Sequence, residues 1–415
     1  MALCRLHCGA MIVTEHFQRP AEQGPWPAAL DAILSPGMCR AAEREIADWP
    51  GYAPTPLRDL DLLAGQLGIA ALHYKDEGGR LGLGSFKALG GAYAVLCLAA
   101  ERLGEAGGSP PDLRSVREGR HEAALRDLTV VTATDGNHGR SVAWGARMAG
   151  CRCRIYIHAG VSPGREAALR ALGAEVCRID GDYDDSVRLC DRDAAAQGWF
   201  VVSDTSYAGY DRLPRQVMAG YSVMAAEVLA QLDSPPSHVF VQAGVGGLAA
   251  ALCARLWQAL GPRRPRFVIV EPARAACLLA TARNGRPTAV PLLEETAMAG
   301  LSCGEVSLLA WEILARGASD YLAIGEADVG PAMHLLATGR AGGGRIVAGE
   351  SAVPGLIGLL GVASDPDLRR AVGLEARSRV LLFGCEGATD PAIYLAMTGH
   401  PPPGPDATGA GAGHA

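Results

Sequence analysis

The 415-residue chain is poor in aromatic residues and has no large excess of charge of either sign. Phe, Trp and Tyr make up 5% of it, so a surface that stacks on nucleic-acid bases is not expected. The formal net charge is −6 and the isoelectric point is near 6.0, which argues against a general nucleic-acid or anionic-membrane binder. The hydrophobic share of 49% is that of an ordinary globular protein with a large core.

Long hydrophobic runs are also missing. The most apolar stretches, residues 92–100 and 354–363, are too short to span a bilayer. Residues 1–23 are interrupted by Arg5, His7 and Glu15 and contain no signal-peptide core. We therefore expect a cytoplasmic protein with no membrane partner.

The twelve cysteines are scattered without repeated CxxC spacing. Cys4, His7 and Cys8 lack a second ligand pair at zinc spacing, so no metal site is predicted. We expect most of the cysteines to be small buried residues in a reducing compartment. A single disulfide, for instance between Cys277 and Cys303, stays open.

What the chain does contain is an alternation of strand-like and helix-like segments. Ser162 followed by Pro163 predicts the start of one of the helices. Strands that alternate with helices predict an α/β fold of mostly parallel sheets flanked by helices, with ligands bound at the carboxyl ends of strands. Residues 105–126 are expected to be a mobile surface insertion and 401–415 a disordered tail. The predicted strands lie within residues 127–134, 151–158, 174–180, 198–204, 237–242, 265–271, 320–325 and 378–384.

A glycine-rich loop follows the strand at 237–242 and precedes a helix. Gly244, Gly246 and Ala249 fit the G-x-G-x-x-G/A dinucleotide fingerprint, and Glu271 stands near the place of a ribose-binding acid. Taken alone, this pattern favours a nicotinamide-dependent enzyme. The physical requirement is more general, because backbone N–H groups at a helix N-terminus bind any phosphate. A purely structural turn is a further interpretation.

Lys87 lies in the glycine-rich stretch GLGSFKALGG, residues 82–91, at the predicted start of a helix. A cation is disfavoured there by the exposed N–H groups and the helix dipole. We expect the dipole and partial burial to lower the pKa of Lys87, which would make its amine competent to form a Schiff base. Pyridoxal phosphate would explain both features, with its phosphate on the glycine loop and its aldehyde on Lys87. The alternative is a solvated surface lysine.

Several motifs together resemble one enzyme family. PTPL, YKDEGGRLGLGSFKALGGAY, TDGNHG, QAGVGG and FGCEGATD occur in the order found in fold-type II pyridoxal-phosphate enzymes, the tryptophan synthase β-like superfamily. The resemblance covers about residues 50–395. Within that group the chain most resembles the diaminopropionate ammonia-lyases, and Asp135 stands where dehydratases usually have a small hydroxyl residue.

The resemblance implies an architecture and a reaction. A larger cofactor-binding domain would comprise residues 51–94 and 206–400, a smaller inserted domain 95–205, and an N-terminal extension 1–50, with the cofactor between the domains of a homodimer. The implied reaction is α,β-elimination of 2,3-diaminopropionate to pyruvate and ammonia. The alternatives are a serine/threonine dehydratase-type lyase, a nicotinamide oxidoreductase, and a cofactor-binding protein without turnover.

The resemblance also implies roles for single residues around the cofactor. Lys87 would hold pyridoxal phosphate and then act as a base, and Cys385 would place a neutral thiol against the pyridine nitrogen. The remaining cofactor-binding residues would be Phe86 beside the ring, Asn137 at its phenolic oxygen, Gly244, Val245, Gly246 and Gly247 around the phosphate, and Glu350 with Ser351 near the ring.

Two aspartates are expected to distinguish the substrate. Asp135 and Asp204 each follow a predicted strand, and carboxylates would attract the second ammonium of diaminopropionate. Asp135 would be the base on the face opposite Lys87, and Asp204 would orient the β-ammonium or move protons. Thr134 and His138 are further candidates for substrate contact, although His138 could be structural. A helix N-cap for Asp135 and an ordinary turn for Asp204 are the competing interpretations.

Overall fold

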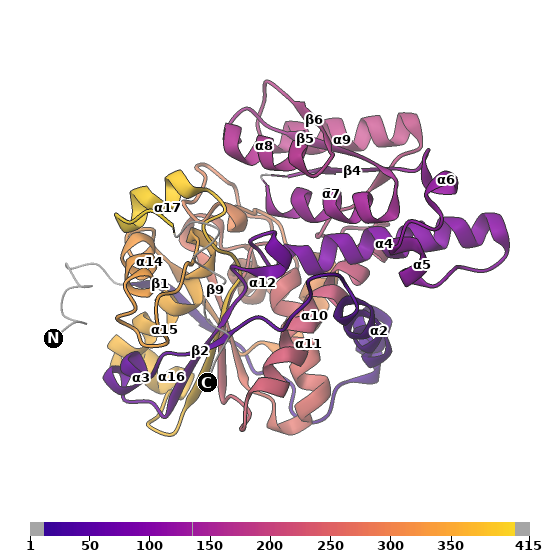
Figure 1. Ribbon diagram of the computed structural model, residues 1–415. Helices are drawn as coiled ribbons and strands as arrows, with labels where there is room; N and C mark the ends of the chain where they lie inside the picture. Colours follow the sequence, from indigo (N-terminus) through magenta and orange to yellow (C-terminus); the bar gives the residue numbers. More distant parts are fainter. Residues whose placement is uncertain (1–11, 135, 403–415) are drawn as a thin grey trace, which may run out of the picture.

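The computed structural model describes residues 12–134 and 136–402. Asp135, the segment of Cys4, His7 and Cys8, and residues 403–415 of the expected tail lie outside the described residues. The described strands form two sheets, one of seven strands and one of four, which Figure 1 shows in separate parts of the molecule.

The seven-stranded sheet has the order β1-β10-β9-β8-β11-β3-β2. Its inner strands run parallel, whereas the edge strands β1 and β2 run antiparallel to their neighbours. Every residue of β8 and β10 is buried, as expected for parallel strands covered on both faces. The strands are β1 (Val13–Gln18), β2 (Leu57–Asp59), β3 (Ala71–Asp76), β8 (His238–Gln242), β9 (Arg266–Pro272), β10 (Asp320–Ile324) and β11 (Arg379–Gly384).

The four-stranded sheet has the order β6-β5-β4-β7, and all of its pairs are parallel. Its strands are β4 (Thr129–Ala133), β5 (Arg152–Ile157), β6 (Glu175–Arg178) and β7 (Phe200–Val201). The helices α7 (Asn137–Ala149), α8 (Pro163–Ala171) and α9 (Tyr183–Gln197) pack against it (Figure 1). Ser162 caps α8 as predicted, since its Oγ accepts a hydrogen bond from Arg165 N at 3.3 Å. The predicted α/β fold with parallel sheets is confirmed.

Helix α4 (Lys87–Gly107) connects the two parts, because it packs against both α7 and α10 (Arg212–Gln231) (Figure 1). Glycines allow these helices to approach closely. A Cβ atom on Gly220 would lie 2.3 Å from the Leu89 carbonyl oxygen, and one on Gly91 would lie 2.7 Å from Ser141 Oγ. The first turn of α4, which carries Lys87, is therefore held firmly from both sides.

The segment expected to be a mobile insertion is folded instead. It contains α5 (Leu113–Arg117) and α6 (Glu122–Leu125), which bury Val116 and Leu125. Arg117 Nε also donates to Glu45 Oε1 at 3.0 Å. The expectation was wrong because it rested on the many charged residues of this segment. Its two apolar residues are buried, and its Arg117 pairs with a residue of α2 (Pro36–Ala47).

The remaining helices surround the larger sheet. Helix α15 packs across β8, β9 and β10, and a Cβ atom on its Gly355 would lie 2.7 Å from the Phe240 carbonyl oxygen. None of the described helices combines the length and apolar character needed to cross a membrane. These helices are α1 (Asp31–Leu34), α3 (Asp61–Leu67), α11 (Gly247–Leu260), α12 (Cys277–Asn284), α13 (Leu308–Gly317), α14 (Val329–Ala337), α15 (Pro354–Ser364), α16 (Pro366–Val372) and α17 (Pro391–Thr398).

Candidate active site

A cavity lies where the carboxyl ends of strands from both sheets meet. Its walls come from the loops after β4, β7, β8 and β11 and from the start of α4. Every described residue that the sequence analysis assigned to the pyridoxal-phosphate site lines this cavity: Phe86, Lys87, Thr134, Asn137, His138, Asp204, Gly244, Val245, Gly246, Gly247, Glu350, Ser351 and Cys385. Asp135 lies outside the described residues, so its role stays a prediction.

Lys87 is the first residue of α4, in agreement with the sequence. Its backbone N–H donates to Ser85 Oγ at 3.1 Å, and its Nζ forms an ion pair with Asp204 Oδ2. The Phe86 ring centroid lies 5.4 Å from Nζ. The ammonium is thus directed into the cavity and toward the loop after β7.

The ion pair corrects the expected protonation of Lys87. Burial alone would lower the pKa of the ammonium, but the Asp204 carboxylate outweighs it, so that the pKa lies above its ordinary value. Burial alone would likewise raise the pKa of Asp204, whereas the Lys87 charge holds it well below its usual range. The sequence prediction of a lowered lysine pKa was wrong because it left out this carboxylate, which lies 117 positions away in the chain.

The glycine loop has the geometry of an anion site. Gly246 has φ +97° and directly precedes α11, so the loop turns the backbone into the helix N-terminus. No described residue accepts a hydrogen bond from the N–H groups of residues 244–247. Donors without acceptors at the positive end of a helix fit a phosphate group.

The dinucleotide interpretation of the same loop does not fit the structure. Glu271 is completely buried, and its two carboxylate oxygens accept hydrogen bonds from Leu278 N and Leu279 N, each at 2.7 Å. The side chain is therefore fully used in capping α12 and cannot reach a ribose. Burial raises its pKa to about 8.

Cys385 follows β11 at the wall of the cavity. Its thiol is 4% exposed and donates to the Ser351 carbonyl oxygen at 3.1 Å. Burial raises the pKa of the thiol well above its usual value, so the group is neutral. A neutral group at this position agrees with the partner expected for a pyridine nitrogen. Cys277 and Cys303 are not joined to each other by a disulfide bond.

Two charged residues of the wall, Glu386 and Arg165, had not been nominated from the sequence. Asn137 Nδ2 donates to Glu386 Oε2 at 2.6 Å, and Arg165 Nη2 donates to Glu350 Oε1 at 3.3 Å. Both contacts join the four-stranded part to the seven-stranded part. Burial, with the nearby Glu386 charge, raises the pKa of Glu350 to about 7. Glu386 could have been found beside Cys385 in the CEG motif, whereas Arg165 on α8 carries no local signal.

His138 is buried and makes one hydrogen bond, between Nε2 and the Val202 carbonyl oxygen at 2.8 Å. Because a carbonyl only accepts, the proton of the neutral ring is on Nε2. Its Nδ1 is buried and has no partner among the described residues. Burial lowers the pKa of His138, so Nδ1 offers a lone pair, which suits an ammonium group better than a substrate carboxylate.

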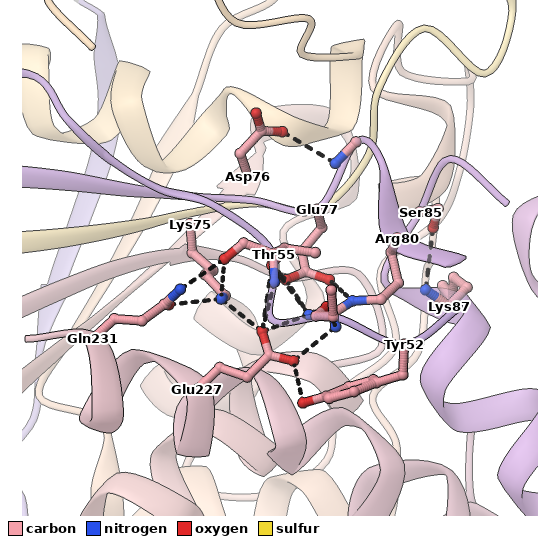
Figure 2. Close-up of polar contacts among 12 residues, drawn as sticks. Tyr52, Thr55, Lys75, Asp76, Glu77, Arg80, Ser85, Lys87, Glu227 and Gln231 are labelled. Carbon is pink, nitrogen blue, oxygen red and sulfur yellow. Dashed lines mark hydrogen bonds and ion pairs between the residues drawn. The ribbon is translucent and has the colours of Figure 1, made fainter. Parts of the chain in front are cut away.

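A buried ionic cluster supports the segment that leads to Lys87 (Figure 2). Arg80 is 1% exposed and forms two hydrogen bonds to each of Glu77 and Glu227, at 2.7–2.8 Å. Lys75 Nζ lies 2.6 Å from Glu227 Oε2, so two cations balance two carboxylates. Figure 2 shows that Asp76 points away from this cluster, toward the backbone of Gly78. The cluster joins β3 and the 77–86 segment to α10.

The comparisons with known proteins agree with this geometry. The family model of pyridoxal-phosphate dependent enzymes matches residues 49–386. The chain belongs to this family, and its cofactor is pyridoxal 5'-phosphate.

Particular relatives narrow the similarity to one kind of lyase. The chain is 36% identical over 355 residues to a diaminopropionate ammonia-lyase of Salmonella typhimurium, covering 83% of this chain and 88% of the relative. It resembles the solved holo diaminopropionate ammonia-lyase of Escherichia coli with a TM-score of 0.84 and 33% identity, over 92% of this chain and 96% of the other. The Escherichia coli enzyme in complex with an aminoacrylate–PLP azomethine intermediate gives a TM-score of 0.81 at 33% identity, with the same coverage. The recognised resemblance and the fold-type II fold are confirmed.

Proposed function

We propose that this chain converts 2,3-diaminopropionate to pyruvate and ammonia by α,β-elimination. The observation that carries the proposal is the pairing of Lys87 with Asp204 in a cavity that also contains the phosphate-type glycine loop. The similarity to diaminopropionate ammonia-lyases over most of the chain supports the choice of substrate.

The cavity residues fit pyridoxal phosphate, and different residues would bind different parts of it. The N–H groups of residues 244–247 would hold the phosphate, and Lys87 the aldehyde carbon. The neutral Cys385 thiol would face the ring nitrogen after its S–H turns away from the Ser351 carbonyl oxygen. Phe86 and Asn137 would contact the ring and its phenolic oxygen, with Glu350 nearby. When bound, the cofactor supplies an electron-withdrawing ring that makes the Cα–H of an attached amino acid acidic.

The protein side chains then move the protons. Lys87 Nζ would remove the Cα proton of the substrate on one face, and Asp204 would orient the β-ammonium as it leaves as ammonia. The released enamine is hydrolysed in water to pyruvate and a second ammonia. Asp135 is proposed as the base on the opposite face, which would let both Cα configurations react.

The charge of the cavity supports a substrate with two amino groups. Asp204 and Glu386 line it together with Glu350, which is only partly ionised at neutral pH, against the cations Lys87 and Arg165. A substrate with an additional ammonium gains from these carboxylates, whereas serine carries no such group. Thr134 and the Nδ1 of His138 complete the proposed substrate contacts.

The decisive experiment is incubation of the purified holoenzyme with D- and L-diaminopropionate, serine and threonine, following keto-acid release. We expect both diaminopropionate isomers to be turned over faster than either hydroxy amino acid. The matched control is Lys87→Ala, which should release no keto acid and leave no cofactor attached after borohydride treatment. Rapid serine turnover with no reaction of diaminopropionate would replace the proposal by a dehydratase.

We further propose that the enzyme is a cytoplasmic homodimer with the domain division given by the resemblance: residues 51–94 and 206–400, with 95–205 inserted. The two-sheet arrangement supports the division, since β4 to β7 all lie within 95–205. Light scattering on the purified chain tests the dimer, and limited proteolysis tests the boundaries.

A further inference from the structure

Tyr221 on α10 lines the same cavity as Lys87 and Asp204, and the reaction described above gives it no role. Its side chain is 1% exposed, and its hydroxyl makes no hydrogen bond of good geometry with a described residue, although Lys87 lies close enough to lower its pKa. A buried hydroxyl without a partner destabilises a fold, and phenylalanine would fill the same space without that cost. The hydroxyl therefore calls for an explanation other than packing.

The ring of Tyr221 is held in one place. Its centroid lies 4.6 Å from that of Phe86, the residue before Lys87. On the other side it presses on α4 at a glycine, since a Cβ atom on Gly90 would lie 2.4 Å from Tyr221 Cε1. The hydroxyl is thus presented to the cavity by a rigid ring beside the first turn of α4.

Lys87 faces several titratable groups in this cavity. Asp204 follows β7, Tyr221 comes from α10, His138 from α7, and Cys303 and Cys385 from the loops after η6 (Ala299–Leu301) and β11. Burial raises the pKa of the Tyr221 hydroxyl, while the Lys87 charge lowers it and the Asp204 charge raises it. Both members of the ion pair therefore act on this hydroxyl.

The two partners of Lys87 differ in what they can offer. A carboxylate only accepts hydrogen bonds, so Asp204 stabilises the ammonium and not the free amine. A phenol both donates and accepts, so Tyr221 can serve the lysine in either protonation state. The chemistry of Lys87 needs the free amine, because only the amine has a lone pair that can attack an aldehyde or remove a proton.

We propose that Tyr221 is a positioning residue whose hydroxyl donates a hydrogen bond to Lys87 Nζ when that nitrogen is a free amine. In this step one N–H bond of the Lys87 ammonium breaks, its proton passes by way of the Asp204 carboxylate to water, and the vacated lone pair accepts the Tyr221 O–H. No oxidant or co-reactant is needed. The proposal rests on the proposed role of Lys87 as the cofactor-bearing residue.

The test measures how fast Lys87 takes up its cofactor rather than turnover. The full chain is freed of cofactor and mixed with pyridoxal phosphate at a series of pH values, and the absorbance of the attached cofactor is followed. Tyr221→Phe should load about tenfold more slowly at neutral pH, with its rate profile moved by about one unit to alkaline pH, because the free amine has lost its donor. Urea unfolding of the same cofactor-free chains gives their stability.

Tyr321→Phe is the matched control. Tyr321 is also completely buried, but its hydroxyl donates to the Leu314 carbonyl oxygen at 3.0 Å, away from the cavity. We expect Tyr321→Phe to lose stability and keep the wild-type loading profile, and Tyr221→Phe to keep or gain stability and shift the profile.

Two results overturn the inference. One is a Tyr221→Phe loading profile that superimposes on that of the wild type. The other is a loss of stability in Tyr221→Phe equal to that of Tyr321→Phe, since the hydroxyl would then have a structural partner. A wild-type chain that never attaches the cofactor contradicts the role of Lys87 instead, so the two failures are distinguishable.

Discussion

The Lys87 ammonium and the Asp204 carboxylate form an ion pair inside the cavity, and this pair keeps the lysine protonated when no cofactor is attached. An ammonium has no lone pair, so Lys87 must give its proton away before it reacts. Asp204 is the described carboxylate in direct contact with it, so Asp204 lies on the path by which that proton leaves.

Asp204→Asn should therefore change both the pKa of Lys87 and the rate of turnover. The pKa of the lysine is expected to fall, because burial would then act without the opposing carboxylate, and cofactor loading should shift to more acidic pH. This direction is opposite to that expected for Tyr221→Phe. Turnover of diaminopropionate should fall by about 10²–10⁴-fold, the usual contribution of a positioned acid–base group. Unchanged turnover in steady-state assays would exclude Asp204 from the proton transfers.

The sequence located the parts of the site that are local in the chain. The start of α4 at Lys87, the glycine loop before α11 and the Ser162 cap all depend on neighbouring residues, and all were predicted correctly. The pKa of Lys87 was not, because it depends on Asp204 across the cavity. Tyr221 was missed for the same reason, since one tyrosine on a long helix of small apolar residues gives no pattern.

For Glu271, by contrast, the sequence pattern suggested a function that the structure does not support. Its spacing from the glycine loop imitates a ribose-binding acid, although in the structure it only caps α12. Spacing alone could not separate the two, because both uses place a carboxylate at the end of a parallel strand. The Lys87 segment favoured pyridoxal phosphate over a nicotinamide cofactor, because it supplies a lysine for a Schiff base.

Glu227→Gln is expected to destabilise the protein by about 3–5 kcal/mol, because it leaves Lys75 and Arg80 buried with one carboxylate fewer. Urea unfolding of the cofactor-free chain measures this cost. The matched control is Asp367→Asn, which removes one partner of the exposed Arg370–Asp367 pair and should leave stability unchanged. Equal effects of the two changes would mean that the cluster around Arg80 does not hold the 77–86 segment.

Glu350→Gln should alter how stability depends on pH. The pKa of Glu350 is about 7 in the folded chain against 4.5 for the free side chain, so folding favours its protonated form. This contribution is present below pH 4.5 and is lost as the pH rises through 7. The variant, which is always neutral, should be more stable than the wild type by about 1–3 kcal/mol above that range.

The check on Glu350 is a set of urea unfolding curves at several pH values on the cofactor-free chain. Glu305→Gln serves as control, since Glu305 is exposed and its replacement should give a profile parallel to that of the wild type. If the stability of Glu350→Gln depended on pH in the same way as that of the wild type, folding would not raise the pKa of Glu350.

Gly220→Ala tests whether the contact between α4 and α10 fixes Lys87. A Cβ atom there would lie 2.3 Å from the Leu89 carbonyl oxygen, and backbone cannot move aside as a flexible side chain can. We expect a loss of about 1–3 kcal/mol in urea unfolding, as for other overpacked cores. Cofactor loading should also become slower, because the displaced α4 carries Lys87. Gly65→Ala is the matched control: Gly65 lies in α3 with open space around its Cβ position, so alanine should stabilise by about 0.5–1 kcal/mol. If Gly220→Ala behaved like Gly65→Ala, the two helices would have room to part, and the rigid placement of Tyr221 beside Lys87 would lose its basis.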